Sequence, residues 1–367
     1  MSEKLFCSHC GAEIDRDEMF EFGGAVYCAG CIDELTTLCD CCNTRIRRGD
    51  VHGDGETELC SSCYDSYYTT CEDCGVLLHN DDAYFDDDND YPYCHSCYEK
   101  LQQASIKSYN YKPEPIFYGT GPLFMGAELE IDKGGEDIGN ADDLLAVANR
   151  GGEHIYCKHD GSISNGFEIV SHPMTLEYHK SNMNWQEVFE NAVSMNYRSH
   201  QTSTCGLHVH INRTALGRTL DTQEDVISRI VYFVENHWNE LLKFSRRTEE
   251  NINRWANRYG ISATAKDTYK NAKNKHMGRY VAVNLENYDT IEFRIFRGTL
   301  RYKTFIAVLQ LVYEICRFAI QLDDKGMEGL SWSEFVSLIP ADKPELIEYL
   351  KSKRLYINEI SSESEEI

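Results

Sequence analysis

A cysteine pattern that occurs three times at a fixed spacing constrains the fold of this chain more than any other feature. Twelve of the 16 cysteines in the 367 residues obey it, and the copies start at positions 7, 39 and 71, which are 32 residues apart both times. The first two copies have the form C-x2-C-x17-C-x2-C, and the third has 19 residues between its pairs. A fixed period indicates one supersecondary unit used three times. The cysteines are Cys7, Cys10, Cys28 and Cys31, then Cys39, Cys42, Cys60 and Cys63, then Cys71, Cys74, Cys94 and Cys97.

The spacing within each copy is typical of a zinc site, because two C-x2-C turns bring four thiolates to one tetrahedral Zn²⁺. The start, Met-Ser-Glu-Lys-Leu, is unlike a signal peptide, so we expect zinc rather than disulfides. We predict three zinc units within residues 1–104, at about 7–35, 39–67 and 71–101. Each should contain a knuckle, a hairpin and a helix that carries the second cysteine pair. Such units resemble treble-clef or LIM-like zinc units, although strict LIM spacing is not met.

Each zinc unit is too small to bury a sufficient core, so the metal is expected to supply folding free energy. A closed set of four protein ligands is typical of a structural site and not of a catalytic one. Cys41 is an alternative ligand because it directly precedes Cys42. Further competitors for the metal are the histidines of this region, His9, His52, His79 and His95.

Charge is spread unevenly along the chain. The formal net charge is −24, and residues 1–110 contribute −16 of it, with 7 Lys+Arg against 23 Asp+Glu. This surface repels the backbone of nucleic acids, so no nucleic-acid partner is expected. The acidic run 86–90 is either a solvated hairpin tip or a docking surface for a basic peptide or protein. No run of 18 apolar residues occurs, and we therefore expect no membrane partner and a cytoplasmic location.

The rest of the chain is expected to form one larger domain. Residues 105–122 have the character of a linker, 123–345 form the domain, and 346–367 comprise a helix end and an acidic, disordered tail. Residues 246–279 hold nine Lys/Arg against three acids, which indicates either a site for a polyanion such as a nucleoside triphosphate or a solvated loop. Apolar periodicity predicts helices over 141–149, 175–195, 222–244, 305–322, 331–338 and 344–350, and strands over 125–132, 166–173, 205–212, 279–284 and 289–298.

Polar side chains occur in strands whose composition favours burial. Glu128 and Glu130 lie two apart and therefore face one side of a sheet, as do His208 and His210. Taken singly, each has an ordinary explanation: a half-solvated strand, a satisfied core histidine or an internal ion pair. Together they would be costly to bury unless they share divalent cations. The full set is Glu128, Glu130, Asp160 near a strand end, Glu168, His208, His210, Glu292 and Arg294. Glutamates with histidine suit Mg²⁺ or Mn²⁺ better than Zn²⁺.

Five motifs follow one another along residues 123–321: G-x-E-x-E, D-G-S, E-I-V-S-x-P, C-G-x-H-V-H and E-x-R-x-x-x-G. In this order they resemble the amidoligase family, carboxylate–amine ligases of the glutamine synthetase/glutamate–cysteine ligase superfamily found in phages and bacteria. The resemblance implies an α+β fold, with an antiparallel sheet that forms an open funnel, helices packed outside it and ATP at one end. A phage origin would place the protein in the host cytoplasm.

The resemblance also implies roles for single residues. Glu128, His208 and Glu292 would hold the metal on the ATP phosphates, and Glu130 and Glu168 the metal on the acyl side. Arg294 would contact the transferred phosphoryl group, and His210, Arg246 and Arg247 would contact the nucleotide. Asp160 is a candidate base by position, and Cys205 is expected to be structural. The implied reaction forms an acyl phosphate from a carboxylate and ATP, and an amine then displaces phosphate to give an amide or isopeptide bond.

Two other functions remain as alternatives. A cluster of His208, His210 and carboxylates would also suit a metal-dependent amide hydrolase. A non-catalytic adaptor, in which the zinc units dock a protein and the second domain only binds, is the other. The carboxylate and amine substrates are not specified by any motif.

Overall fold

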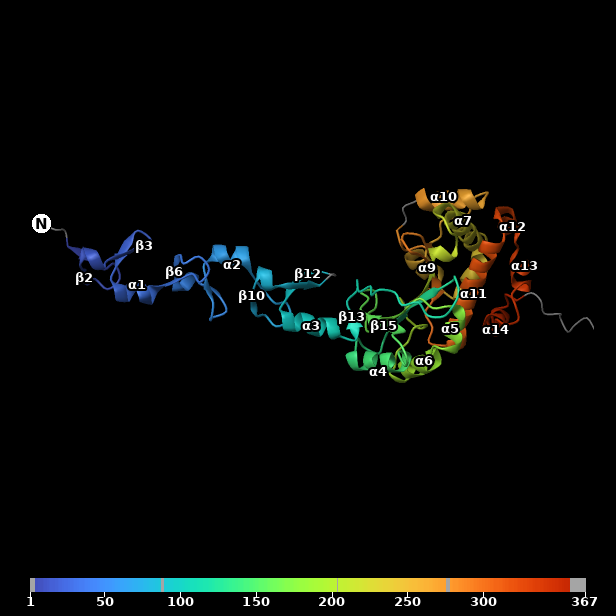
Figure 1. Ribbon diagram of the computed structural model, residues 1–367, viewed down its shortest axis with the longest axis horizontal. Helices are drawn as coiled ribbons and strands as arrows, with labels where there is room; N and C mark the ends of the chain where they lie inside the picture. The colour runs from blue at the N-terminus through green and yellow to red at the C-terminus, as the bar shows by residue number, and fades with distance from the viewer. Residues whose placement is uncertain (1–3, 87–88, 203, 275–277, 357–367) are drawn as a thin grey trace, which may run out of the picture. The chain divides into compact units, whose positions relative to one another are not determined.

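A computed structural model describes residues 4–86, 89–202, 204–274 and 278–356. The chain divides into two compact units, residues 1–103 and 104–367 (Figure 1). The predicted acidic tail lies outside the described residues, as do two positions of the acidic run, 87 and 88.

The first unit contains three copies of one arrangement: two short hairpins and a helix. The hairpins pair β1 (Leu5–Phe6) with β2 (Glu13–Ile14), β3 (Phe20–Phe22) with β4 (Ala25–Tyr27), β5 (Thr36–Leu38) with β6 (Arg45–Arg47), β7 (His52–Gly53) with β8 (Glu58–Leu59), β9 (Tyr68–Thr70) with β10 (Leu77–His79), and β11 (Tyr84–Asp86) with β12 (Asn89–Tyr93). The helices are α1 (Ala29–Leu35), α2 (Ser61–Tyr67) and α3 (His95–Gln103). Short 3-10 turns, η1 (Arg16–Glu18), η2 (Arg48–Asp50) and η3 (Asn80–Asp82), join the two hairpins of each copy.

The backbone of the first cysteine pair repeats in all three copies. The turn closes with an N–H donated to the carbonyl of the first cysteine, from Gly11 to Cys7, from Asn43 to Cys39 and from Gly75 to Cys71. These donors have φ values of 72°, 56° and 71°, a left-handed conformation that glycine and asparagine tolerate best. The predicted knuckle, hairpin and helix are thus present in each copy.

The second unit is built on a seven-stranded sheet of order β13-β15-β16-β14-β17-β19-β18. All neighbouring strands are antiparallel except β13 and β15, which are parallel. The sheet is therefore mixed, whereas the resemblance implies an antiparallel sheet. Its strands are β13 (Ile106–Lys107), β14 (Met125–Ile131), β15 (Ile155–Lys158), β16 (Phe167–Ser171), β17 (Gly206–Asn212), β18 (Val283–Asn284) and β19 (Thr290–Arg297). β13 lies within residues 105–122, so the segment expected to be a linker contributes an edge strand.

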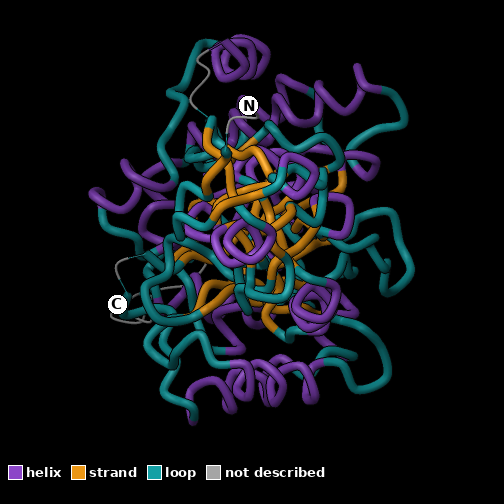
Figure 2. Tube along the Cα trace, turned by 90° about the vertical axis from the view of Figure 1, so that its left-hand side faces the viewer, coloured by secondary structure: helices purple, strands orange, loops and turns teal. Residues whose placement is uncertain are grey.

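One face of this sheet carries the core. Alternate residues such as Leu129, Val209 and Phe293 are buried there among the helices. In Figure 2 strands gather in the middle of the view together with some helices, and further helices lie around them. The helices are α4 (Ile138–Ala148), α5 (Leu176–Ser181), α6 (Trp185–Ser194), α7 (Leu220–Asn236), α8 (Trp238–Ser245), α9 (Glu249–Trp255), α10 (Ala265–Asn274), α11 (Tyr302–Gln321), α12 (Asp324–Gly329), α13 (Trp332–Ser337) and α14 (Pro344–Ser352), with the turn η4 (Arg213–Ala215).

The predicted α+β class is confirmed, while several helix boundaries differ. Residues 175–195 form two helices, because Asn182 ends α5 and Asn184 precedes α6. Residues 222–244 break at His237 into α7 and α8. The segment 246–279, in which no helix was predicted, contains α9 and α10. Within the described residues, α11 is the one helix long and apolar enough to cross a membrane, and 78% of its most apolar window is buried inside the unit.

Candidate active site and zinc sites

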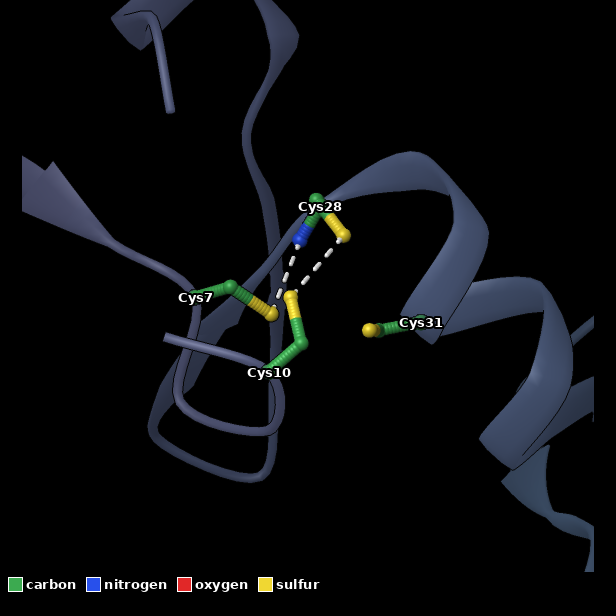
Figure 3. A group of neighbouring side chains, drawn as sticks. All are labelled: Cys7, Cys10, Cys28 and Cys31. Carbon is green, nitrogen blue, oxygen red and sulfur yellow. Dashed lines mark hydrogen bonds between the residues drawn. The ribbon is translucent and has the colours of Figure 1, made fainter. Parts of the chain in front are cut away.

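The cysteines of each copy converge as a zinc site requires. Figure 3 shows the sulfurs of Cys7 and Cys10, from the turn, facing those of Cys28 and Cys31, from the start of α1. In each of the three sets all four Sγ atoms lie within 4.8 Å of one another. The Cys10–Cys28, Cys42–Cys60 and Cys74–Cys94 Sγ atoms are 3.9, 3.8 and 3.8 Å apart. Thiolates at about 2.3 Å from a tetrahedral Zn²⁺ have this separation, which is far longer than a disulfide bond.

Backbone groups prepare the first cysteine of each set as a thiolate. The N–H groups of Cys10 and Cys28 lower the pKa of Cys7 to about 6. The N–H of Cys28 reaches the Cys7 Sγ at 3.4 Å, and that of Cys60 reaches the Cys39 Sγ at 3.3 Å. The four-cysteine sets therefore fit structural zinc by donor type, number and spacing.

The alternative zinc ligands are placed differently. Cys41 and Cys42 are both exposed, but the converging set of sulfurs contains Cys42 and not Cys41. His52 packs on Tyr64 with ring centroids 5.3 Å apart, and His79 and His95 likewise contact tyrosine rings.

In the second unit, the sheet face opposite the core collects the polar side chains predicted from the sequence. The pairing sets Glu130 opposite Glu168, and Glu128 opposite His208. It also sets His210 opposite Glu292. The register of β17 and β19 shifts between Leu207 and Val209, so Phe296 pairs with the core residue Leu207. The regular alternation of side chains between the two sheet faces therefore stops in β19 beyond Arg294.

Glu128, His210 and Glu292 form a first group whose ligand atoms lie within 4.8 Å of one another. His210 Nε2 is 3.1 Å from Glu128 Oε1 and 3.9 Å from Glu292 Oε1. This nitrogen is buried and, despite its closeness to Glu128, forms no hydrogen bond of regular geometry with the described residues, while the ring's Nδ1 lies 3.1 Å from the Thr290 hydroxyl. A nitrogen lone pair that faces carboxylates requires a proton or a metal ion between them.

Glu128, Glu168 and His208 form a second group of the same kind. His208 Nδ1 lies 3.4 Å from Glu128 and 3.5 Å from Glu292, and its Nε2 lies 3.9 Å from Glu130. Glu128 is thus common to two adjacent groups. The donor set, carboxylates with imidazoles on rigid strands, fits two divalent cations.

The resemblance pairs His208 with Glu292 at one metal and leaves His210 to the nucleotide. In the structure both histidines approach Glu292, with His208 Nδ1 at 3.5 Å and His210 Nε2 at 3.9 Å. A carboxylate oxygen of Glu130 accepts a 2.5 Å hydrogen bond from the backbone N–H of Gly206. A Cβ at Gly206 would lie 2.3 Å from the Arg247 guanidinium and 2.8 Å from His208, so only glycine fits there without displacing them.

The charges of the site shift its pKa values in opposite directions. Burial opposes ionisation of Glu128, but His210 and hydrogen bonds from the histidines hold its pKa well below the usual range. Burial, together with the charge of Glu128, raises the pKa of Glu168 well above the usual range. Burial would lower the pKa of His210, but Glu128 and Glu292 raise it. Such a divided set of carboxylates is typical of a functional site.

Two cavities of about 600 Å³ each open on this face of the sheet. The cation cavity, as we call it, contains both Glu128 groups and the apolar residues Phe117 and Phe124. The arginine cavity contains Glu130 and four arginines, Arg247, Arg254, Arg279 and Arg294. Five residues line both cavities: Tyr109, Asp160, His208, Arg279 and Arg294.

Two of the predicted nucleotide contacts are separated. Arg247 is buried in the arginine cavity, and burial lowers its pKa to about 10. Arg246 adopts a left-handed φ of 60° after α8 and lies over the Tyr349 ring, 5.9 Å from its centroid. Arg246 lines neither cavity.

Several site residues carry no signal in the sequence. The Lys158 Nζ lies 3.2 Å from Glu168, and the pair is almost wholly buried. Asn284 donates a 2.8 Å hydrogen bond to Glu292, and Arg294 also pairs with Glu292. Lys158 lies two residues before the D-G-S motif, and nothing in its sequence position indicates a partner. The antiparallel register of β15 and β16 sets it opposite Glu168.

Comparisons with known proteins support the resemblance. Residues 146–316 match the family model described as "Putative amidoligase enzyme". The matched residues include Glu168, His208, His210, Glu292 and Arg294, and they begin after β14.

No curated protein matches the chain. Among solved structures, the crystal structure of a bifunctional glutathione synthetase from Pasteurella multocida is similar, with 14% identity and a TM-score of 0.34. The similarity covers 63% of this chain and 46% of that one, so the chain spans about half the length of that protein. Residues 146–316 of the chain are therefore similar to the amidoligase family.

Proposed function

We propose that this protein is an ATP-dependent ligase that uses Mg²⁺, or Mn²⁺, to join a carboxylate to an amine. The observation that carries the proposal is the pair of cation-binding groups that share Glu128 on one sheet face. The match of residues 146–316 to the amidoligase family model supports the same reaction class. Two divalent ions beside an arginine are typical equipment for phosphoryl transfer.

The nucleotide is proposed to bind in the cation cavity. That cavity holds both groups of candidate ligands, and the exposed rings of Phe117 and Tyr288 at its edge offer apolar surface for a base. The bound ions would neutralise phosphate charge and orient the γ-phosphoryl group. Glu128, Glu168, Glu292, His208 and His210 would hold them.

The reaction then proceeds in two displacements. A carboxylate oxygen of the acid attacks the γ-phosphorus of ATP, which forms an acyl phosphate and releases ADP. The amine nitrogen next attacks the acyl carbon, the carbon–oxygen bond to phosphate breaks, and phosphate leaves. Arg294, which lines both cavities, is positioned to contact the transferred group.

Asp160 is the proposed acceptor of the amine proton. It lines both cavities, so it can approach an amine that enters from either side. Its Oδ1 accepts a 2.7 Å hydrogen bond from the N–H of Ser162, which fixes the carboxylate at the turn between β15 and β16.

The zinc array, residues 7–103, is proposed to dock a basic peptide or protein. Its cysteines must remain reduced to bind zinc, so we propose a cytoplasmic location for the protein. Exposed aromatic residues, Phe20, Tyr84, Phe85 and Tyr91, lie on the second hairpins of an acidic unit. Aromatic anchors with surrounding charge are common in protein-binding surfaces.

Hydroxylamine trapping tests the ligase proposal without knowledge of the amine. The full chain is incubated with Mg·ATP, hydroxylamine and a panel of carboxylic acids. A ligase forms hydroxamate and ADP in equal amounts, and formation of both should require the acid. ATP hydrolysis that is independent of every acid, or amide cleavage without nucleotide, would contradict the proposal.

Glu128→Gln is the matched active-site variant. It removes a ligand shared by two groups, and we expect a loss of at least about a hundredfold, or about 2.7 kcal/mol of transition-state stabilisation. Glu190→Gln, at an exposed position on α6, is the control and should retain wild-type activity.

A further inference from the structure

We infer that the acid used by this protein carries a second anionic group, which the arginine cavity binds while the first carboxylate reacts. The inference rests on the proposed function and names the class of its acyl substrate.

Three arginines of this cavity lack an acidic partner. Arg247 is buried, and its Nε donates to the Phe296 carbonyl at 3.1 Å. Arg254 lies over the Trp255 ring, 4.6 Å from its centroid. Arg279 donates to the Tyr109 and Tyr280 hydroxyls at 2.5 and 3.2 Å. Across the described part of the chain, none of the three forms an ion pair with a carboxylate, whereas Arg294 pairs with Glu292.

Burial makes Arg247 the strongest of these anion-binding groups. Arg247 is 8% exposed and its guanidinium lies against Gly206, and the charge of Glu130 opposes the lowering of its pKa by burial. A buried guanidinium without a partner is costly unless a ligand supplies negative charge. A carboxylate or phosphate matches its planar set of donors.

The position of the cavity separates this ligand from the nucleotide. Both groups of candidate cation ligands, which a triphosphate needs, line the cation cavity. Glu130 faces the arginine cavity, and the residues that line both cavities are Tyr109, Asp160, His208, Arg279 and Arg294. An acid that extends from this junction into the arginine cavity places one carboxylate at the γ-phosphate and its remaining charge beside Arg247 and Arg254. The rings of Trp255 and Tyr280 then contact the carbon chain between the two charges.

The test compares diacids with their monoamides. Glutarate with glutaramate and succinate with succinamate are pairs of nearly equal shape that differ by one charge. Each acid is supplied to the full chain with Mg·ATP and hydroxylamine, and hydroxamate is measured. Binding of the same four compounds to the full chain with Mg²⁺ and a non-hydrolysable ATP analogue is measured by calorimetry. We expect each diacid to be preferred at least about tenfold over its monoamide in both measurements.

Arg254→Gln, at an arginine that lines the arginine cavity and not the cation cavity, should remove most of that preference. It should raise the half-saturating concentration of the diacid about tenfold and leave that of ATP within about twofold. Lys270→Gln, at an exposed position in the same basic segment and outside both cavities, is the control.

Three results would overturn the inference: equal binding of diacid and monoamide, no binding of either diacid at millimolar concentration, or a rise in the ATP requirement alone. The last result would assign Arg254 to the nucleotide. Diacid binding that depends on Arg254, without hydroxamate from any acid, would retain the anion site and reject the ligase reaction.

Discussion

Lys158 shows how much a single residue contributes to this site. Its ammonium group lies 3.2 Å from Glu168, on a sheet face where Glu128 and Glu130 add further negative charge. In the absence of divalent cations it supplies positive charge that the buried carboxylates need.

Lys158→Met is therefore expected to destabilise the protein by on the order of 3 kcal/mol in Mg²⁺-free buffer. Adding Mg²⁺ or Mn²⁺ should reduce the difference between variant and wild type, because a cation replaces the lost charge. Chemical denaturation with and without the metal measures both quantities. A difference that Mg²⁺ leaves unchanged would mean that no cation binds beside Glu168.

His210 and Glu168 link stability to pH in the Mg²⁺-free protein. The pKa of His210 is raised, so its contribution is fully present below its unfolded pKa of about 6.5 and is lost as pH rises through the folded value. The raised pKa of Glu168 acts with the same sign, because the folded state holds that proton more tightly.

We expect the unfolding free energy of the Mg²⁺-free protein to fall as pH rises above about 6.5, the unfolded pKa of histidine. The stabilisation by added Mg²⁺ should grow over the same range, because protons and the metal compete for the same atoms. His210→Asn should weaken the pH dependence of the unfolding free energy, measured by chemical denaturation of the zinc-loaded, Mg²⁺-free protein. An unchanged pH dependence in the variant would show that His210 does not contribute to it.

At the scale of elements, each zinc unit depends on two turns and one helix start. The second zinc unit, residues 39–67, has a small core whose buried residues are Leu59 and the cysteines Cys39 and Cys63. Such a core cannot maintain the unit by itself, so its stability should depend on its own metal ion.

Cys42→Ser should lower the zinc content from three ions per chain to two, since it removes one of four ligands. Cys41→Ser is the matched control, with an exposed thiol one position away, and should retain three ions. Metal analysis of the purified variants measures the difference. Loss of zinc in the Cys41 variant in place of the Cys42 variant would shift the ligand set by one residue.

At the scale of the whole molecule, two units divide the chemistry of the chain. Residues 1–103 hold the cysteine sets, and residues 104–367 hold the sheet, both cavities and the core. We expect folding of residues 1–103 to be linked to zinc and that of residues 104–367 to apolar burial.

Unfolding should consequently show two transitions. Removal of zinc by a chelator should abolish one transition and leave the other, and Mg²⁺ with ATP should stabilise only the one that survives the chelator. Differential scanning calorimetry of the full chain measures both. A single transition that zinc removal shifts as a whole would show that the two units unfold together.

The sequence predicts some of these features because they depend on local spacing. The C-x2-C turns define their own ligands, and the helices that follow start at the second pair in all three copies. Glu128 and Glu130, like His208 and His210, share a face because strand side chains alternate. Helix ends were less predictable, since the breaks at Asn182 and His237 and the helix α9 depend on how neighbouring segments pack.

By itself, the sequence determined three zinc units, an α+β second domain and a set of polar strand residues on a common face. Only the tertiary structure decided which of those residues meet. Strand order places β14 between β16 and β17, and that order makes Glu128 common to two groups and brings Lys158 to Glu168. It also separates Arg247, buried beside Gly206, from Arg246, which turns away to Tyr349. Spacing along one strand is a local property, whereas register between strands distant in sequence is set by the packing of the whole core.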